Sequence, residues 1–474
     1  MSTKTPYLIA ILPLIILVCL LSYNVIIYGD NSLNGANQLA LLLAASIATI
    51  IGIYFDSSWD KIIKGISNSI SSTTSAIIIL LLIGALAGTW LLSGIIPVMI
   101  YYGLQILNVK IFLLATTIIT AIISIVTGSS WSTIATIGIA LLAIGQALGF
   151  PPGIIGGAII SGAYFGDKMS PLSDTTNLAP AMAGSDLFTH IRYMTYTTIP
   201  SFLITIIIFL ILGFTYNTTN EQDINVLLNI ISHSCNITPA LLLVPLIVII
   251  FIIKKTPAIP ALFIGIILAS LFAIIFQPEL IKEIAKSSHI NIKSCYKAII
   301  AAMSYNISIN TENEMINNLL STNGMSGMLN TIWLIICAMV FGGTMESTGL
   351  LKRIAEPIIK YAKNTGSLIS TTAGTCIFFN ITTSDQYLSI VVPGKMFAKT
   401  YKKKGLAPEN LSRTLEDSGT VTSVLIPWNT CGATQSAVLG IATLTYLPYC
   451  FFNLLTPVIT IIYAYFGIKI KKIK

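Results

Sequence analysis

Long apolar segments alternate with short polar ones along the whole chain. Runs without any Asp, Glu, Lys or Arg include Tyr7 to Ile27, Gln38 to Tyr54, Ile199 to Phe214 and Ile237 to Ile253. Each approaches the roughly 20 apolar residues that a helix needs to cross a hydrocarbon core about 30 Å thick. The first run is followed by no small-residue cleavage site, so it is predicted to be a retained span. With 54% hydrophobic residues, a mean hydropathy of +0.85 predicts an all-α polytopic membrane protein.

The formal charge of +8 is concentrated in short segments close to the ends of apolar runs. Basic residues gather at Lys254–Lys255, from Lys352 to Lys363, from Lys399 to Lys404 and in the closing KIKKIK, whereas the loop from Tyr216 to Asn236 has no Lys or Arg. This is the positive-inside distribution that orients membrane helices. It predicts a multi-pass protein of the lipid bilayer with both termini in the cytoplasm, and no nucleic-acid partner.

Two parts of the chain match each other at a constant offset of 256 residues. The matching positions are Thr127, Ile134, Gly149, Pro152, Pro171, Ala181, Gly184 and Thr189, which recur as Thr383, Ile390, Gly405, Pro408, Pro427, Ala437, Gly440 and Thr445. Just upstream, GTWLLSG from Gly88 echoes GTMESTG from Gly343. Because prolines, glycines and polar breaks coincide, the match predicts an internal repeat.

Tracing the apolar runs across a membrane predicts about ten crossings and two re-entrant hairpins. The third span would run from about Ser75 to Tyr102, and the hairpins would turn at 127–130 and 382–386. The two copies then have opposite orientations, an inverted repeat with broken helices that is typical of transporters. The predicted organisation is 1–74, N-terminal scaffold spans; 75–214, repeat 1 with a broken helix at 152–183; 215–328, outer loops around scaffold spans at 238–276; and 329–474, repeat 2 with a broken helix at 407–440.

Non-helical backbone at membrane depth is tolerated only where it is buried in protein or lines a cavity. A binding site is therefore expected at the breaks TGSSWS, SPLSDTTN, TTSDQY and IPWNTCGA. Their hydroxyl, amide and carboxylate oxygens are hard ligands that suit an alkali cation. The candidate cation-binding residues in these breaks are Ser129, Ser130, Thr175, Thr176, Asn177, Thr383, Ser384, Asn429 and Thr430.

A charged side chain in the middle of a membrane costs about 2.5–3.5 kcal/mol on insertion scales, so its default interpretation is functional. The carboxylates expected to couple ions and protons are Asp174, Asp385, Asp167, Glu346 and Asp417. Each could instead cap a helix near the membrane surface, as we expect of Asp186. Asp167 could also form an ion pair with its neighbour Lys168. Asp417 aligns with Ser161 in the repeat, and this difference in charge favours a role in a site.

The motif GDKMSPLSDTTNLA (Gly166 to Ala179), preceded by TGSSWSTIATIG and followed by HIRYMTYTTIPS, resembles the NhaC family of sodium/proton antiporters. GALAGTWLLSGIIP, FGGTMESTGLL and VLIPWNTCGA are also similar to segments of that family. The resemblance covers nearly the whole chain. It implies a member of the ion transporter superfamily in the bacterial inner membrane, with a scaffold part and a transport part, often assembled as a homodimer. Residues in matching motifs are Asp167, Asp174, Thr175, Asn177, Asp385, Asp417 and Asn429.

The sequence has no ATP-binding motif, which argues against a primary pump. It also has no evident nucleophile–base set, which argues against an enzyme. The histidines, His190, His233 and His289, are predicted to lie in loops. No cofactor is expected, and sodium is the transported or coupling ion. Cys235 and Cys295 could fall on the same side of the membrane and pair, but free thiols are expected of scattered cysteines.

The predicted function is a secondary active transporter that exchanges sodium for protons by alternating access. Sodium would be held by Asp174, Asp385, Thr175, Asn177 and Asn429, and its binding would expel a proton from a buried carboxylate. The alternative is a sodium- or proton-coupled exchanger of a small organic acid, of the malate or lactate type, or of an amino acid. A dicarboxylate site would need a cationic partner such as Lys168, Arg192 or Lys395. A channel would not require an inverted repeat with paired hairpins.

Overall fold

The computed structural model describes residues 5–28, 32, 34–216, 221–254, 256–311, 314–355, 357 and 364–473. Within these ranges the chain is almost entirely helical, with a small antiparallel sheet that pairs Ile307 with Thr322. Three basic positions or segments that contribute to the predicted orientation, Lys255, residues 358–363 and Lys474, lie outside the described residues.

The first half of the chain contains the segments predicted to be the N-terminal spans and the first repeat. Its elements are α1 (Tyr7–Tyr28), α2 (Ala36–Tyr54), α3 (Trp59–Ser72), α4 (Thr74–Leu92), α5 (Ile95–Ile106), η2 (Val109–Ile111), α6 (Phe112–Thr127), α7 (Ser130–Thr133), η3 (Ile134–Gly138), α8 (Ile139–Ala147), α9 (Pro152–Met169), α10 (Asp174–Ala183) and α11 (Leu187–Thr215). The long apolar runs form helices because a helix satisfies every backbone N–H and C=O within its own segment, as lipid requires.

The segments predicted to be the connection and the second repeat follow. The connection consists of α12 (Glu221–Ser234), η4 (Pro239–Leu242), α13 (Leu243–Ile253), α14 (Ala258–Phe276), α15 (Pro278–Ala285), α16 (Ile292–Ser304), β1 (Ile307–Ser308), α17 (Glu314–Leu319), β2 (Ser321–Thr322) and η5 (Gly324–Met328). The second repeat consists of α18 (Leu329–Ser347), α19 (Leu350–Ala355), α20 (Thr365–Thr382), α21 (Gln386–Lys403), α22 (Pro408–Leu415), η7 (Glu416–Thr420), η8 (Ser423–Leu425), α23 (Thr430–Leu439), α24 (Thr443–Tyr446), η9 (Leu447–Tyr449) and α25 (Phe451–Phe466).

The number of long apolar helices agrees with a polytopic membrane protein. In the part of the chain that the structure describes, eight helices are long and apolar enough to cross a membrane, or up to ten if each of two bent helix pairs is one span. The bent pairs are 225–234 with 239–253, and 443–449 with 451–466. The prediction of an all-α polytopic fold with broken helices is confirmed.

The internal repeat is also visible in the backbone conformation. Gly128, with φ 69°, closes the turn of the first hairpin, and Ser384, with φ 59°, closes the second at an offset of 256 residues. Other left-handed positions recur at the same or nearly the same offset: Gly94 with Gly349, Gly149 with Gly405, and Gly184 with Gly440. Few described residues have left-handed backbone, so its recurrence at equivalent positions indicates that the sequence repeat is also a structural repeat.

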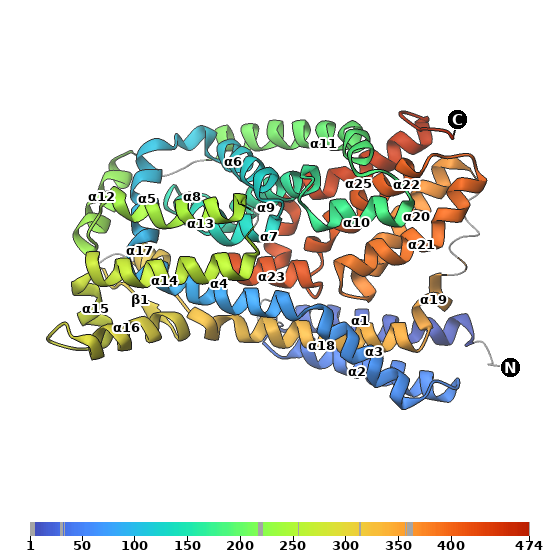
Figure 1. Ribbon diagram of the computed structural model, residues 1–474, viewed down its shortest axis with the longest axis horizontal. Coiled ribbons are helices and arrows are strands. Elements are labelled where there is room, and N and C mark those ends of the chain that lie inside the picture. The colour runs from blue at the N-terminus through green and yellow to red at the C-terminus, as the bar shows by residue number, and fades with distance from the viewer. Residues whose placement is uncertain are drawn as a thin grey trace.

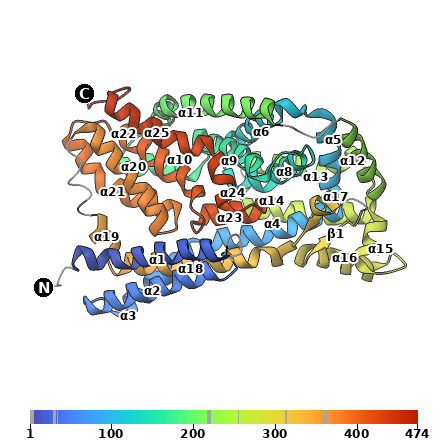
Figure 2. The same cartoon turned by 180° about the vertical axis from the view of Figure 1, so that it is seen from behind.

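The two hairpins enter the molecule from opposite ends. Figures 1 and 2 show the arms of the first hairpin, α6 and α8, reaching the middle of the molecule from the end where α12 lies. The arms of the second hairpin, α20 and α21, approach from the end where both termini lie. The two repeats therefore have opposite orientations, and their polar breaks meet in the middle.

Small residues allow the closest helix contact of the first repeat, between α6 and α9. A Cβ atom on Gly162 would lie 2.2 Å from the carbonyl oxygen of Thr117, and one on Gly166 would lie 2.4 Å from that of Ala121. Close backbone approach of this kind is how helices associate in lipid, where apolar side chains gain little from contact with one another. The packing fixes the end of α9 against the first hairpin.

Three segments differ from the apolar pattern. The span predicted from Ser75 to Tyr102 is interrupted by Gly94, whose φ of 79° separates α4 from α5. Residues 59–72, which the apolar pattern leaves as a connection, form the amphipathic helix α3, which packs on α18. Residues 277–328, predicted as an outer loop, contain short helices and the sheet. Short amphipathic helices have too few apolar residues to register as spans.

Cys235 and Cys295 are both free thiols, as expected.

Candidate functional site

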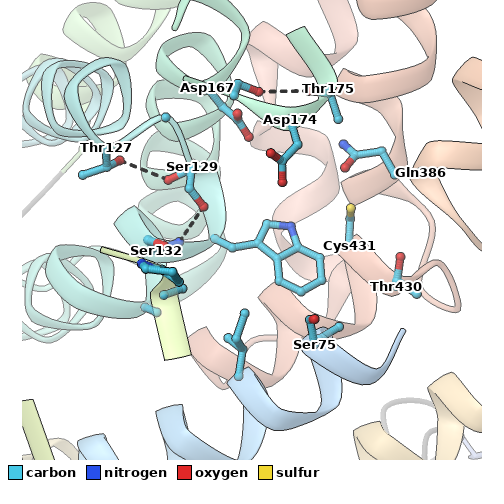
Figure 3. Close-up of a pocket in the computed structure, with 18 of the residues that line it drawn as sticks. Ser75, Thr127, Ser129, Ser132, Asp167, Asp174, Thr175, Gln386, Thr430 and Cys431 are labelled. Atoms are coloured by element: carbon cyan, nitrogen blue, oxygen red, sulfur yellow. Dashed lines mark hydrogen bonds between the residues drawn. The ribbon is translucent and has the colours of Figure 1, made fainter. Parts of the chain in front are cut away.

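The four polar breaks surround a cavity of about 640 Å³. Its wall also includes the α3–α4 junction and the turn between α13 and α14. Figure 3 shows the side chains of Asp174 and Gln386 directed into this space from α10 and α21. Polar residues that line it are Ser72, Thr73, Ser75, Thr127, Ser129, Ser132, Asp167, Ser173, Asp174, Thr175, Thr256, Asp385, Gln386, Tyr387, Thr430 and Cys431.

The tip of the first hairpin holds one of the cavity carboxylates in place. Gly128 ends α6, and Ser129 caps α7 by accepting a hydrogen bond from the backbone N–H of Ser132 (3.2 Å). The next residue, Ser130, donates both its hydroxyl (2.6 Å) and its backbone N–H (3.1 Å) to Oδ2 of Asp167. Two donors to one oxygen orient the Asp167 carboxylate and stabilise its charge.

The first broken helix presents a second carboxylate. Ser173 caps α10 by accepting from the backbone N–H of Thr176 (3.4 Å), which places Asp174 in the first turn of that helix. The Thr176 hydroxyl donates to the backbone carbonyls of Asp167 (3.3 Å) and Lys168 (3.1 Å), where α9 ends. A negative charge in a first helical turn is favoured by the helix dipole. Asp174 is exposed to the cavity rather than buried.

The second hairpin and the second broken helix supply the opposite wall. Asp385 caps α21 by accepting from the backbone N–H of Leu388 (2.8 Å). Asn429 caps α23 in the same way, and the backbone N–H of the next residue, Thr430, donates to the carbonyl of Ser384 (2.9 Å). That bond joins the hairpin tip to the broken helix, so the two breaks of this repeat form one unit.

The hydrogen bonds that hold each hairpin against its broken helix are repeated. The hydroxyl of Ser130 bonds to Asp167 in the first repeat, and the amide of Gln386 bonds to the hydroxyl of Ser423 (3.0 Å) in the second, at positions 256 residues later. A further matching pair joins Ser124 to the carbonyl of Ala163 and Asn380 to the carbonyl of Gly419. The contact between hairpin and broken helix is therefore built in the same way in both repeats. Only the first repeat has a carboxylate in it, because Asp167 corresponds to Ser423 in the second.

Six of the predicted site residues line the cavity. They are Asp167, Asp174, Asp385, Ser129, Thr175 and Thr430. The two repeats meet directly here, because the hydroxyl of Tyr387 from the second hairpin lies 3.5 Å from Oδ2 of Asp174. The sequence prediction that Asp174 and Asp385 face a common space agrees with this arrangement.

Other predicted residues support the breaks instead of lining the cavity. They are Ser130, Thr176, Asn177, Thr383, Ser384 and Asn429. The Asn177 amide donates to the backbone carbonyls of Pro171 (2.9 Å) and Ser173 (2.7 Å), and so closes the loop before α10. The Asn429 amide donates to the side chain of Asn380 (3.2 Å) within the second repeat.

Two predicted carboxylates lie away from the cavity. Glu346 is exposed in the last turn of α18. Asp417 is fully buried in η7 and forms an ion pair with Lys168, which is equally buried. Asp417 also accepts a hydrogen bond from the hydroxyl of Thr197 (2.8 Å) and one from that of Thr460. The ion pair considered between Asp167 and Lys168 is therefore wrong, because the partner of Lys168 comes from the other repeat.

The predicted location of two histidines is also wrong. His190 is fully buried in α11, with Nδ1 2.8 Å from the hydroxyl of Ser412, and His233 lies in α12. The polar start of α11 resembles a connection, but Asp186 begins the helix by accepting from the backbone N–H and the hydroxyl of Thr189 (both 3.0 Å). These donors lower the pKa of Asp186. The expectation that Asp186 caps a helix is confirmed.

The Na+/H+ antiporter family matches residues 162–468 of this chain. The chain is also 37% identical over 435 residues to the Na+/H+ antiporter NhaC of Alkalihalophilus pseudofirmus, an alignment that covers 92% of this chain and 91% of that protein. This chain belongs to the Na+/H+ antiporter family. The resemblance noted in its motifs is thereby confirmed.

Two further relatives are named for other activities. The malate-2H+/Na+-lactate antiporter of Bacillus subtilis is 37% identical over 433 residues, covering 91% of this chain and 89% of that protein. The arginine/ornithine antiporter ArcD of Halobacterium salinarum is 33% identical over 465 residues, covering 97% and 92%. The family match begins within α9, so it includes three of the four breaks but leaves out the first hairpin.

Sequence reasoning missed three residues of this antiporter. Trp131 and Tyr387 both line the cavity, and they occupy equivalent positions 256 residues apart. The repeat offset could have identified them as a pair of aromatic residues directly after the hairpin tips. The third residue, Glu416, precedes Asp417 and is fully buried, and no local motif distinguishes it.

Proposed function

We propose that this chain is a secondary active transporter, not an enzyme, which exchanges sodium for protons across the cell membrane by alternating access. The observation that carries the proposal is the composition of the cavity. Three carboxylates, Asp167, Asp174 and Asp385, line it together with hydroxyl groups, and none of its described lining residues is Lys, Arg or His. A wall of this kind favours a cation that prefers oxygen ligands.

The positions of the basic residues argue against an organic anion as the main substrate. Lys168 is fully buried in its ion pair with Asp417. Arg192 and Lys395 are exposed and absent from the cavity wall. A dicarboxylate would meet three carboxylates with no cation to offset them, and like charges at close range repel by several kcal/mol.

A small organic substrate remains the second candidate because of the volume of the cavity. About 640 Å³ falls in the range of small-molecule pockets, roughly 300–1,000 Å³. The aromatic side chains of Trp131 and Tyr387 add an apolar surface to its wall. A coupled organic acid or amino acid of modest size would fit beside a cation, as in the relatives that carry malate, lactate, arginine or ornithine.

In the proposed mechanism Asp174 is the carboxylate for which sodium and protons compete. It faces the cavity from the first turn of α10, and the hydroxyls of Thr175 and Thr430 and the carboxylate of Asp385 can complete an oxygen shell. A sodium ion favours the ionised carboxylate, so its binding displaces the proton. Asn177 and Asn429, predicted as ligands, would contribute indirectly by fixing the loops that carry this shell.

Alternating access would come from movement of the hairpins and broken helices against the peripheral spans α1, α2, α13 and α14. Both termini lie at the same end of the molecule, opposite α12. Helix α21 ends at Lys403, and the lysines of its last turn lie at the same end of the molecule as the termini. The positive-inside rule therefore supports a cytoplasmic location for both termini. The peripheral spans would also provide the contact of a homodimer.

The test is transport by purified protein in liposomes that contain a pH-sensitive dye, with sodium, lithium, potassium, malate, lactate and arginine added in turn. We expect sodium-driven proton movement that Asp174→Asn abolishes, because the amide keeps the shape but cannot titrate. Asp385→Asn should mainly weaken the apparent affinity for sodium, because it removes a charge-assisted ligand while keeping the cap.

Asp186→Asn is the matched control, since Asn caps helices as well as Asp does and this residue lies outside the cavity. It should exchange like the wild type. Unchanged sodium/proton exchange in Asp174→Asn would assign that residue a structural role only. Proton movement driven by an organic acid and not by sodium would replace the main proposal with the second candidate.

A further inference from the structure

The second repeat contains a buried carboxylate that the mechanism above does not use. Glu416 opens η7, the π-helical turn that follows α22, and its side chain is fully buried. Neither of its carboxylate oxygens has a hydrogen-bond partner. An ionised carboxylate without donors is strongly disfavoured in a low-dielectric interior, so the surroundings of Glu416 favour its protonated form. π-helical turns within helices are frequent at functional sites.

The ammonium group of Lys168 is close to two adjacent carboxylates, Glu416 and Asp417. Lys168 donates to Asp417, which also accepts from the hydroxyls of Thr197 and Thr460 and is therefore satisfied as an anion. Glu416 is the preceding residue in the chain and has Lys168 and the hydroxyl of Thr420 as neighbours, but neither of its carboxylate oxygens is hydrogen-bonded to them. Of the two adjacent carboxylates, one is built to stay ionised and the other is not.

Most of the other charged groups around η7 have contacts of their own, but Nε and Nη2 of the buried Arg413 have no hydrogen-bond partner. Asp167 is an electrostatic neighbour of Glu416. On α22, Glu409 pairs with Lys471 (2.5 Å) and Arg413 stacks on Tyr193, with its guanidinium carbon 4.6 Å from the ring centre. On α10, Asp174 faces the cavity. Helices α20 and α25, which also pack against η7, contain no Asp, Glu, Lys, Arg or His. The lysines of α21 are all exposed: Lys395, Lys399, Lys402 and Lys403.

Comparison of the two repeats indicates that the fold does not require these charges. The positions that carry charge in one repeat are uncharged in the other: Asp167 and Lys168 correspond to Ser423 and Val424, and Glu416 and Asp417 correspond to Ile160 and Ser161. Both repeats nevertheless form the same broken helix. Charges at mid-membrane that the fold can do without are functional by default.

We propose that Glu416 is a proton-binding site separate from the cation ligands and coupled to the cavity through Lys168, an assignment that rests on the proposed sodium/proton exchange. Asp167 and Lys168 are consecutive residues in the last turn of α9. The side chain of Asp167 lines the cavity, while that of Lys168 lies beside Glu416 and Asp417. This turn therefore links the cation to the buried carboxylates.

The coupling follows from charge. With Glu416 protonated, the buried group has one ammonium and one carboxylate anion, and its net charge is zero. A sodium ion in the cavity adds positive charge next to α9, which favours ionisation of Glu416. The proton leaves the Glu416 carboxyl for water, and Lys168 then balances two adjacent carboxylates instead of one. When sodium leaves, the proton returns, and no other bond changes.

The experiment separates sodium binding from proton release in detergent-solubilised protein. NaCl is titrated into weakly buffered protein with a pH-sensitive dye, and choline chloride controls for ionic strength. Sodium binding is measured independently as sodium-dependent thermal stabilisation. We expect Glu416→Gln to keep the stabilisation and to release clearly fewer protons per bound sodium than the wild type, because only the proton displaced from Asp174 remains. Glu416→Asp, which keeps a titrating group, should restore release with a shifted pH midpoint.

Glu409→Gln is the matched control, because it removes another buried carboxylate of the same helical segment that is already ion-paired. It should release protons like the wild type. Full proton release by Glu416→Gln would overturn the proposal, and so would loss of sodium-dependent stabilisation in that variant. If the wild type neither releases protons nor exchanges them for sodium in liposomes, the proposed function fails first and the assignment of Glu416 with it.

Discussion

The ion pair between Lys168 and Asp417 can be tested as a buried interaction that joins the two repeats. Both side chains are fully buried. Lys168→Met leaves the Asp417 carboxylate with only the hydroxyls of Thr197 and Thr460 as donors. Removing one partner of a buried pair costs about 3–5 kcal/mol because the other charge remains uncompensated. That is a large share of a typical folding stability of about 5–15 kcal/mol.

The double variant makes the prediction specific. Asp417→Asn can still bond to the two threonine hydroxyls, so Lys168→Met/Asp417→Asn removes both charges and leaves no uncompensated ion. We expect it to be more stable than Lys168→Met alone, with a coupling free energy of about 0.5–3 kcal/mol between the two sites. The measurement is the fraction of monodisperse protein that survives heating in detergent, for the wild type, both single variants and the double variant.

A surface pair of the same protein serves as the control. Lys282 and Glu279 are 2.8 Å apart, but their side chains are 32% and 81% exposed. Exposed pairs contribute only about 0–1 kcal/mol, so Lys282→Met should hardly change the thermal midpoint. If Lys168→Met were no more harmful than Lys282→Met, or if the double variant were as unstable as the sum of the single ones, the buried pair would have no energetic role and the reasoning would be refuted.

Two further predictions concern topology and packing. A cysteine introduced at Asn225 in α12 should react with an impermeant thiol reagent from outside intact cells, whereas one at Lys402 should not; the reverse pattern would invert the proposed orientation. Gly162→Ala should sharply reduce the yield of folded protein, because its Cβ would lie 2.2 Å from the carbonyl of Thr117. Gly374→Ala, with no atom within 4 Å of the added Cβ, should fold normally. Equal yields for the two alanine variants would contradict the close contact between α6 and α9.

Much of the fold could be predicted from the sequence because lipid imposes simple rules on it. Long apolar runs become helices, and polar or glycine-rich breaks mark the hairpin tips, as at Gly128 and Ser384. The constant repeat offset also fixes which breaks correspond. Helix α3 could not be predicted in this way. Its apolar residues cover only one face of a short segment that also contains Lys61 and Lys64, so its mean hydropathy is too low to indicate a span.

The site was predictable only as far as its local signals reach. Asp174 and Asp385 stand among hydroxyl residues at breaks, so the sequence identified them as cavity carboxylates. The partner of Lys168 lies 249 residues away in the chain, and nothing in the sequence near either residue indicates the pairing. The same holds for Glu416, whose two carboxylate oxygens lack hydrogen-bond partners in the folded chain, a property that no motif indicates. Long-range contacts of this kind are set by the packing of the repeats.

The last turn of α9 connects the first hairpin to the buried charges, so movement of this hairpin would strain the contacts of Lys168. Its Asp167 is held by Ser130 at the hairpin tip, whereas the next residue, Lys168, is held by Asp417 in the opposite repeat. The Thr176 hydroxyl fixes the carbonyls of both residues to the start of α10. Two consecutive side chains anchored to different repeats cannot both keep their partners if the hairpin shifts against the second repeat. Because breaking the buried ion pair is the more costly change, we expect the bond to Ser130 to yield first. That would free the cavity carboxylate while Lys168 stays beside Glu416 and Asp417.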